Sequence, residues 1–480
     1  MCGVFGIRST DRDVARLTYF ALFALQHRGQ ESAGIAVSEA GRLTVLRGMG
    51  LVAQVFNEQQ LQALPGEVAI GHTRYSTTGG VHWSNAQPLV HHGRARTVAL
   101  GHNGNLTNAG VLRDELVADG IRLGSTSDTE VIAALIARDP SPLPEAVAAT
   151  MARLEGAYSV VVLVDDTLVT FRDPHGIRPL TLGRIGDDWV VASESCALDL
   201  IGATVERDVR PGEILWFDES GMHSSQALPE GRGAACIFEH VYFARPDSRL
   251  DGSEIHSSRV RMGQILAKEA PAVADLVMPI PDSGTPAAIG FAKTSGIPFE
   301  EGLIKNRYVG RTFIQPDQEL RRQGIKLKFN PLDEVSGQRV VIVDDSIVRG
   351  NTMQQLVAML FDAGAAEVHV RISSPPVVAP CFYGIDMADT DELAAAHRSV
   401  EEMRVRIGAT SLHYLSLEGM QEATRLPEDE VCRACFTREY PTSVPLGVGK
   451  MRFEAEAEGV SGMEEHIPET PSAMLSAPFG

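Results

Sequence analysis

After residue 256, Val- and Ile-rich segments alternate with helical segments. A predicted helix at 256–271 is followed by the short apolar segment 275–281, a turn and a second helix at 285–296. The same order returns between residues 338 and 374. Apolar strands separated by helices are typical of a parallel sheet that is buried on both faces. We therefore predict a parallel α/β domain in this part of the chain.

Residues before about 235 follow a different pattern. Short segments rich in β-branched residues lie among helical segments at 13–29, 127–139 and 141–156. Strands and helices that occur in blocks, without strict alternation, indicate packed layers of sheet and helix. Because 480 residues are too many for one ordinary core, we expect two large domains.

The change of pattern sets the expected domain boundaries. We place the first domain at 2–235 and the second at 236–445. The tail 446–480 is rich in Glu, Ser, Gly and Pro, and is therefore expected to be disordered. The segment 312–335 has no clear period, so we expect a mobile lid there. Its basic residues are Arg321, Arg322, Lys326 and Lys328.

Composition excludes several classes of protein. A net charge of -19 disfavours nucleic acid or an anionic membrane as a partner of the whole chain. No apolar run approaches the roughly 20 residues that a membrane helix needs, and the start does not resemble a secretory signal. Six cysteines are too sparse for a disulfide scaffold in a chain of this length. We expect a cytoplasmic protein.

The stretch VVIVDDSIVRGNT, at 340–352, combines a strand, a turn and a helix start. The apolar strand ends in Asp344 and Asp345, the turn contains Gly350, and the helix begins near Thr352. Backbone N–H groups in such a turn form a cradle for an anion. The carboxylates can bind ribose hydroxyls and lie near Mg²⁺, which prefers oxygen ligands. For an isolated motif, solvated acids before an ordinary capped helix are the commoner explanation.

A cysteine directly follows the initiator methionine. Removal of Met1 would leave Cys2 with a free α-amine, whose ordinary pKa of about 8 suits a general base at neutral pH. Thiolate attack needs donors for the developing oxyanion, and GHNGNL offers the Asn103 side chain and the Gly104 N–H. A cysteine at this position is more often inert, and an Asn-Gly pair is usually a turn.

Two further motifs supply charges of opposite sign. Arg74 in GHTRYS can hold a substrate carboxylate through two hydrogen bonds, and Asp128 in TSDTE can hold an ammonium group. A carboxylate, an ammonium group and an amide together describe glutamine. An arginine after a strand is usually a surface residue, so this hypothesis depends on the motifs occurring together.

The motifs together resemble known families. MCGVFGI, QHRGQESAGI, GHTRYST, GHNGNL and TSDTE, in this order, resemble the N-terminal-nucleophile glutamine amidotransferases. The thirteen residues 340–352 match the signature of the type I phosphoribosyltransferases, and PDSGTP at 281–286 looks like their pyrophosphate loop. Over roughly residues 2–440 the chain resembles the amidophosphoribosyltransferases, which are glutamine-dependent enzymes of purine synthesis.

This resemblance implies a fold and a reaction. It implies an αββα glutaminase domain, a parallel α/β phosphoribosyltransferase domain, and ammonia that passes between them. The reaction converts phosphoribosyl pyrophosphate to 5-phosphoribosylamine with release of glutamate and pyrophosphate, as the first step of de novo purine biosynthesis. Cys2 would be the nucleophile, Arg74 and Asp128 would bind glutamine, and Asn103 with Gly104 would form the oxyanion hole.

The resemblance also implies the acceptor site. One Mg²⁺ per subunit would contact Ser283, Asp344 and Asp345, and the turn 346–352 would hold the 5′-phosphate. The residues expected to bind phosphoribosyl pyrophosphate are Lys305, Arg307, Arg311, Asp344, Asp345, Ser346, Val348, Arg349, Gly350, Asn351 and Thr352.

Four other cysteines suggest a metal centre. Cys432 and Cys435 form the sequence CRAC, whereas Cys236 and Cys381 stand alone. By spacing, they fit Zn²⁺ at least as well as an iron–sulfur cluster, and four unrelated packed thiols are a third option. The resemblance favours one [4Fe–4S] cluster per subunit, because one branch of the family carries it on cysteines in these contexts. Some members of that branch lose a propeptide, whereas here only Met1 precedes the nucleophile.

Two alternative functions differ from this interpretation. A glutamine:sugar-phosphate aminotransferase has a similar start, but it should carry a sugar-isomerase domain, and the stretch 340–352 argues against one. A non-catalytic regulator that senses phosphoribosyl pyrophosphate would not need Cys2, Arg74, Asn103 and Asp128. The family resemblance further implies feedback inhibition by purine nucleotides and a homotetramer or homodimer.

Overall fold

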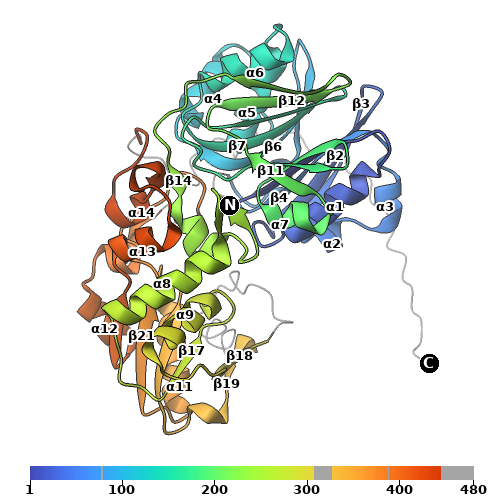
Figure 1. Ribbon diagram of the computed structural model, residues 1–480. Helices are drawn as coiled ribbons and strands as arrows, with labels where there is room; N and C mark the ends of the chain where they lie inside the picture. The colour runs from blue at the N-terminus through green and yellow to red at the C-terminus, as the bar shows by residue number, and fades with distance from the viewer. Residues whose placement is uncertain (77–78, 307–326, 388, 445–480) are drawn as a thin grey trace, which may run out of the picture.

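The computed structural model describes residues 1–76, 79–306, 327–387 and 389–444. Two antiparallel sheets form the centre of the first half of the chain (Figure 1). The seven-stranded sheet has the order β11-β9-β10-β1-β4-β2-β3, and the six-stranded sheet has the order β13-β12-β8-β7-β6-β5. The strands of the first sheet are β1 (Gly3–Arg8), β2 (Ser32–Glu39), β3 (Arg42–Met49), β4 (Val68–Arg74), β9 (Thr181–Ile185), β10 (Asp188–Ala192) and β11 (Thr204–Asp208). The strands of the second are β5 (Leu89–His92), β6 (Thr97–Leu106), β7 (Gly156–Val164), β8 (Thr167–Arg172), β12 (Glu213–Asp218) and β13 (Gly221–Gln226).

Helices cover the outer face of each sheet. The first sheet is covered by α1 (Val14–Ala24), α2 (Val52–Val55), α3 (Glu58–Gln62) and α7 (Ser195–Leu200), and the second by α4 (Ala109–Ala118), α5 (Asp128–Arg138) and α6 (Leu143–Met151). Side chains alternate along each strand, so Val4 packs between the sheets, whereas Phe5 packs against the helical layer. This arrangement confirms the predicted αββα layers. The turn η1 (Trp83–Asn85) lies between β4 and β5.

The second half contains a parallel sheet with the strand order β17-β20-β21-β22. Its strands are β17 (Leu276–Pro279), β20 (Arg339–Asp344), β21 (Glu367–Ile372) and β22 (Ser411–Tyr414). Its helices are α8 (Ile255–Glu269), α9 (Thr285–Ser295), α11 (Asn351–Asp362), α12 (Val400–Ile407), α13 (Leu417–Thr424) and α14 (Ala434–Thr437). Apolar residues of every strand are fully buried, which confirms the predicted parallel α/β arrangement.

Short elements connect and flank these layers. They are β14 (Ala235–Cys236), η2 (Glu239–Phe243), β15 (Arg249–Leu250), β16 (Ser253–Glu254), β18 (Leu303–Lys305), β19 (Phe329–Pro331), η3 (Asp333–Val335), η4 (Thr390–Glu392), η5 (Ala394–Ala396), η6 (Glu428–Glu430) and β23 (Val431–Cys432). Of these, η2 is a π-helical turn. β14 pairs in parallel with β23, so the end of the described chain returns to the start of the second half.

The predicted lid at 312–335 is wrong for its last residues. Phe329–Pro331 forms β19, which pairs with β18, and both Phe329 and Val335 are buried in the core of the second half. Apolar burial therefore holds this part of the segment in place. Residues 307–326, which include Arg321, Arg322 and Lys326, lie outside the described ranges, as does the tail 445–480; Lys328 lies inside them.

The two halves share a continuous apolar core. Met1, Ala157 and Ile177 of the first half pack in one cluster with Phe291 and Val341 of the second. The amino terminus accordingly lies at the junction of the halves (Figure 1). Across the described ranges, we find no helix with the length and apolarity required to span a bilayer.

Candidate active sites

Cys2 lies immediately before β1 and is buried. Its backbone N–H donates to Asn103 Oδ1 at 3.2 Å, and its thiol donates to the carbonyl oxygen of Tyr75 at 3.5 Å. Tyr75 directly follows β4, and Asn103 belongs to β6. The neighbours of Cys2 therefore come from both sheets. Pairing of Gly3 with Thr73 sets this position, because it aligns the start of β1 with the end of β4.

The side-chain amide of Asn103 is only half satisfied. Its Oδ1 accepts from Cys2, whereas its Nδ2 is buried and has no hydrogen-bond partner. A buried unpaired donor costs about 1–3 kcal/mol, so this nitrogen marks a place for an acceptor. Gly104 has φ +153°, and a Cβ there would come within 2.0 Å of the Ala157 carbonyl oxygen. Side-chain and backbone N–H groups of this kind form oxyanion holes.

Arg74 ends β4 and is 2% exposed. Its Nη1 donates to the Gly80 carbonyl at 3.1 Å and contacts Glu31 Oε2 at 3.5 Å. Glu31 also accepts from the backbone N–H and the hydroxyl of Ser76, at 2.8 and 2.9 Å. Glu31 therefore links the Arg74 guanidinium to the chain that follows β4. Sequence reasoning missed Glu31, although it lies within the motif QHRGQESAGI.

Asp128 begins α5 and is also buried. Its Oδ2 accepts from the backbone N–H of Leu106 at 2.9 Å, and its Oδ1 lies 3.7 Å from His102 Nδ1. Burial by itself raises the pKa of Asp128, but His102 and the Leu106 N–H outweigh it, and the pKa falls below its ordinary value. The carboxylate is therefore ionised at neutral pH. Because β6 carries Asn103, His102 and Leu106, one strand positions Asp128 relative to Asn103.

Burial shifts the pKa values of the two titratable groups at the amino terminus in opposite directions. It raises the pKa of the Cys2 thiol, although the amino terminus, the Tyr75 carbonyl and Arg74 act against it. It lowers the pKa of the amine of Met1 from 8.0 to about 5. Met1 itself is 1% exposed. A protonated thiol beside a neutral amine suits a nucleophile that is activated by its own terminus, once Met1 is removed.

In the second half, Asp344 and Asp345 lie at the carboxyl edge of the parallel sheet. The Asp345 N–H donates to Asp344 Oδ1 at 2.9 Å, and the Ser346 hydroxyl donates to Asp345 Oδ1 at 2.5 Å. Burial, with a further contribution from the Asp345 carboxylate, raises the pKa of Asp344 well above its ordinary value. A cation at this edge would stabilise both ionised carboxylates.

The turn after these acids leads directly into α11. Gly350 is its N-cap with φ 80°, so Asn351 and Thr352 present the first unpaired N–H groups of a twelve-residue helix. The Val348 carbonyl accepts from Ala394 at 2.8 Å. The Arg349 guanidinium forms an ion pair with Glu392. The turn therefore offers an anion mainly its backbone N–H groups, since the charge of Arg349 is already paired.

The turn that carries Ser283 lies against the same edge. A Cβ on Gly284 would come within 2.2 Å of the Val343 carbonyl oxygen, so only glycine allows this turn to approach the end of β20. Lys305 Nζ donates to Asp282 Oδ2 at 2.6 Å, which places its charge beside the turn. Arg307 and Arg311 lie outside the described residues.

Four of the other cysteines lie in one region, namely Cys236, Cys381, Cys432 and Cys435. Cys236 and Cys432 are directly paired residues of β14 and β23. The Cys435 carbonyl accepts from Val378 at 2.9 Å, and Cys381 Sγ accepts from the Tyr383 N–H at 3.4 Å. Burial raises the pKa of the thiols of Cys236, Cys432 and Cys435, and the neighbouring thiols add to the effect. Among the residues that the structure places, no three His, Cys, Asp or Glu side chains are close enough to hold a single metal ion.

The segment 379–387 of the second half touches the first site directly. The Tyr75 hydroxyl donates to Asp386 Oδ2 at 3.3 Å, and Asn105 Nδ2 donates to the Phe382 carbonyl at 2.9 Å. Neither Asp386 nor Phe382 was predicted, because nothing in the sequence shows which loop of the second half meets β4 and β6. The second half of the chain thus contacts the first site directly.

The fold and the two sites define a glutamine amidotransferase joined to a phosphoribosyltransferase. The models of two families agree: a glutamine amidotransferase domain matches residues 72–200, and a phosphoribosyl transferase domain matches residues 260–373. The amidophosphoribosyltransferase of Mycobacterium tuberculosis is 51% identical, covering 92% of this chain and 87% of the relative. That of Archaeoglobus fulgidus is 50% identical, covering 93% and 99%.

Solved structures show the same likeness. The glutamine phosphoribosylpyrophosphate amidotransferase of B. subtilis, in complex with ADP and GMP, superposes with a TM-score of 0.88 at 45% identity, over 93% of this chain and 99% of that one. A second structure, of the allosteric regulatory enzyme of purine biosynthesis, has a TM-score of 0.88 at 46% identity, over 93% and 97%.

The chain belongs to the amidophosphoribosyltransferase family. It is an enzyme that converts phosphoribosyl pyrophosphate and glutamine to 5-phosphoribosylamine, glutamate and pyrophosphate, the first step of de novo purine biosynthesis. The alternatives of a non-catalytic regulator and of a sugar-phosphate aminotransferase are thereby excluded.

Proposed function

We propose that Cys2 is the nucleophile of the glutaminase site and that its α-amine is the base. Asn103 Nδ2 and the Gly104 N–H would stabilise the oxyanion, while Arg74 and Asp128 would bind the carboxylate and ammonium groups of glutamine. The observation that carries this proposal is the Asn103 amide, which binds Cys2 through its oxygen and leaves a buried nitrogen without an acceptor.

We propose domains at 2–235 and 236–445, with the acceptor site in the second. The backbone N–H groups of 346–352 would hold the 5′-phosphate, and Asp344 and Asp345 would hold the ribose hydroxyls. Lys305, Arg307 and Arg311 would neutralise the pyrophosphate. Departure of pyrophosphate leaves positive charge on the ribose, so charge neutralisation matters more here than a nucleophilic side chain.

One Mg²⁺ per subunit fits the carboxyl edge of the sheet. Asp344 and Asp345 are adjacent acids, and the pKa of Asp344 is raised. The turn that contains Ser283 packs against the same strand end. These oxygen donors are the type that Mg²⁺ prefers. The metal, when bound, would neutralise charge on the pyrophosphate.

The four cysteines Cys236, Cys381, Cys432 and Cys435 fit a [4Fe–4S] cluster better than Zn²⁺. Four ligands of one zinc ion must converge on a single centre, whereas cluster ligands bind separate iron atoms and stand farther apart. The thiols interact electrostatically but do not converge on one point, which agrees with the cluster. Burial raises the pKa of Cys236, but the buried cation of Arg178 acts against this shift and would favour thiolate ligands. We assign the cluster a structural role.

Ammonia released at Cys2 would pass to the acceptor site, where it attacks C1 of the ribose. Purine nucleotides would inhibit this chain, as ADP and GMP in the B. subtilis complex suggest. The homotetramer or homodimer and the cytoplasmic location stay predictions.

Replacement of Cys2 separates the two half-reactions. Cys2→Ala is expected to abolish synthesis with glutamine and to retain synthesis with ammonia, measured as pyrophosphate release. Thr170→Ala is the control, because Thr170 is a buried residue of β8 with a side chain of similar size, and its hydroxyl donates to the Val160 carbonyl rather than to a neighbour of Cys2. Equal loss with both nitrogen donors would contradict the assignment.

A further inference from the structure

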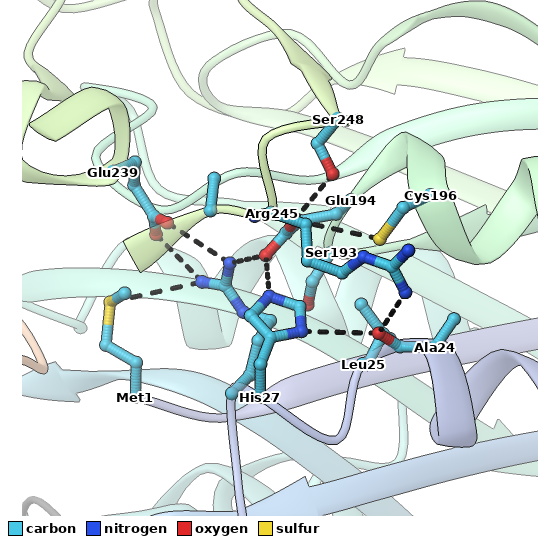
Figure 2. A network of polar contacts seen from close by, with 12 residues as sticks. Met1, Ala24, Leu25, His27, Ser193, Glu194, Cys196, Glu239, Arg245 and Ser248 are labelled. Carbon is cyan, nitrogen blue, oxygen red and sulfur yellow. Dashed lines mark hydrogen bonds and ion pairs between the residues drawn. The ribbon is translucent and has the colours of Figure 1, made fainter. Parts of the chain in front are cut away.

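A network of buried charges surrounds the amino terminus. Figure 2 shows Glu194, Glu239, His27 and Met1 gathered in this network. At its centre is Arg28, whose side chain is fully buried. Arg28 lies in the motif QHRGQESAGI, and none of the roles above uses it.

We propose that Arg28 is a positioning residue for Cys2 and that Glu239, from the second half of the chain, holds Arg28 in place. Arg28 Nε donates to the carbonyl oxygen of Cys2 at 2.9 Å. This inference rests on the proposed role of Cys2 as nucleophile.

Cys2 needs such a contact because it becomes the end of the chain. β1 begins only at Gly3, so strand pairing does not hold Cys2 itself. Chain termini fray unless specific bonds fix them. Two bonds fix the main chain of Cys2: its nitrogen donates to Asn103, and its carbonyl accepts from Arg28. Without the second bond, rotation of the terminal residue would move both the sulfur and the amine.

The remaining nitrogens of Arg28 hold the guanidinium rigidly. Nη1 contacts Glu194 and donates to Glu239 Oε2 at 3.1 Å, and Nη2 donates to Glu239 Oε1 at 2.8 Å. The Phe243 ring lies 5.3 Å from the guanidinium carbon. Arginine presents its donors as a planar fork, so the two-point contact with Glu239 fixes the direction of Nε as well.

Glu194 is in turn held by the surrounding chain. It accepts from His27 Nε2 at 2.7 Å, from the Ser248 hydroxyl at 2.6 Å and from the Arg245 N–H at 2.9 Å. Burial would raise the pKa of Glu194, but His27 and Arg28 outweigh it and lower the pKa. The second half therefore contacts this network twice: Ser248 and Arg245 bind Glu194, and Glu239 binds Arg28 directly.

Glu239 belongs to η2, which the helices of the second half hold. Arg259 of α8 donates to the carbonyl oxygens of His240 and Ala244, both at 2.8 Å. α8 packs against α9, which follows the turn with Ser283. The position of the nucleophile therefore depends on an element of the phosphoribosyltransferase half.

Arg28→Lys tests the proposal, because lysine keeps the charge but cannot bind Cys2 and both carboxylates at once. Arg74 and Asp128 still bind glutamine in this variant, so the defect should appear in kcat rather than in KM. We expect kcat with glutamine to fall about 10- to 100-fold, as for a reacting group misplaced by about 1 Å. KM for glutamine should change less than about threefold, and synthesis with ammonia less than about twofold. Arg371→Lys is the matched control: Arg371 is a buried arginine that binds the carbonyls of Ala270 and Pro271 and does not contact Cys2.

Glu239→Gln provides a second, independent variant in which Arg28 keeps its bonds to Cys2 and Glu194. It should lower kcat with glutamine severalfold, and the double variant should lose less than the product of the two single losses. If Arg28→Lys does not fold, kcat with glutamine in Glu239→Gln alone tests the proposal.

Wild-type kcat in the folded variants, a defect confined to KM, or equal losses with glutamine and ammonia would overturn the proposal. If instead Cys2→Ala retained activity with glutamine, the proposed function would fail, whatever the behaviour of Arg28.

Discussion

Asn103→Leu separates catalysis from stability at the oxyanion site. Leucine has a similar size but removes both the donor and the acceptor of the amide. Loss of the buried unpaired Nδ2 should stabilise the fold by about 1–3 kcal/mol, and loss of the acceptor for the Cys2 nitrogen should cost about as much. The free energy of unfolding is therefore expected to change little.

Activity should respond very differently. Loss of one oxyanion donor typically lowers kcat 10²- to 10³-fold, or about 2.7–4 kcal/mol of transition-state stabilisation. We expect a loss of at least this size in glutamine hydrolysis, because the bond that holds the Cys2 nitrogen is lost as well, with normal synthesis from ammonia. The assay measures glutamate release and pyrophosphate release on the same preparation, together with the thermal unfolding midpoint.

Asn108→Leu is the matched control. Asn108 precedes α4, and both ends of its amide are bonded to groups other than Cys2: Nδ2 donates to the Arg153 carbonyl at 2.8 Å, and Oδ1 accepts from the Glu155 N–H at 3.1 Å. This variant should lose stability and keep its activity, the reverse of Asn103→Leu. Glutamine turnover in Asn103→Leu at the wild-type rate would refute the reasoning. A loss of activity that is fully explained by a smaller folded fraction of the variant would refute it as well.

Three further predictions concern pH, the acceptor site and the cluster. Burial lowers the pKa of the Met1 amine, and we expect it also to lower that of the α-amine that Cys2 gains when Met1 is removed; kcat/KM for glutamine, measured against pH, should therefore decline only below pH 8, and an acid limb at 8 would contradict this. Asp344→Asn should lower synthesis with both nitrogen donors at least about tenfold, or about 1.4 kcal/mol, and spare hydrolysis of a glutamine analogue at Cys2; normal acceptor kinetics would refute the placement. Cys432→Ser should lower bound iron and sulfide and the thermal midpoint, whereas colourless, fully active wild-type protein with one zinc per chain would exclude the cluster.

In the chain that retains Met1, the amine of Met1 also links stability to pH. Because its pKa is lowered in the folded state, the neutral form is favoured by folding. The corresponding stability is present above pH 8 and is lost as the pH falls towards 5.

Local patterns in the sequence were enough to predict most of the architecture. Strand β20 and its acids could be predicted, because a Val-Ile run with a Gly-containing turn and a helix start is a local signal. The αββα layers were predicted from blocks of strands and helices together with a family resemblance. The lid prediction failed at Phe329 and Val335, because burial of a few apolar residues is decided by the surrounding core.

The residues that can do the chemistry were recognisable from local motifs: a cysteine after Met1, an Asn-Gly pair, an arginine after an apolar strand, and two acids before a phosphate-binding turn. Each lies in a motif whose residues are neighbours in the chain. The contacts that hold Cys2 could not be found in this way. Its contacts, Asn103 and Arg28, and the partner of Arg28, Glu239, lie 101, 26 and 237 residues away in the chain, and no local pattern encodes their meeting. They meet because strand pairing aligns β1 with β4, and because the halves share one apolar core in which a buried charge must find its partner.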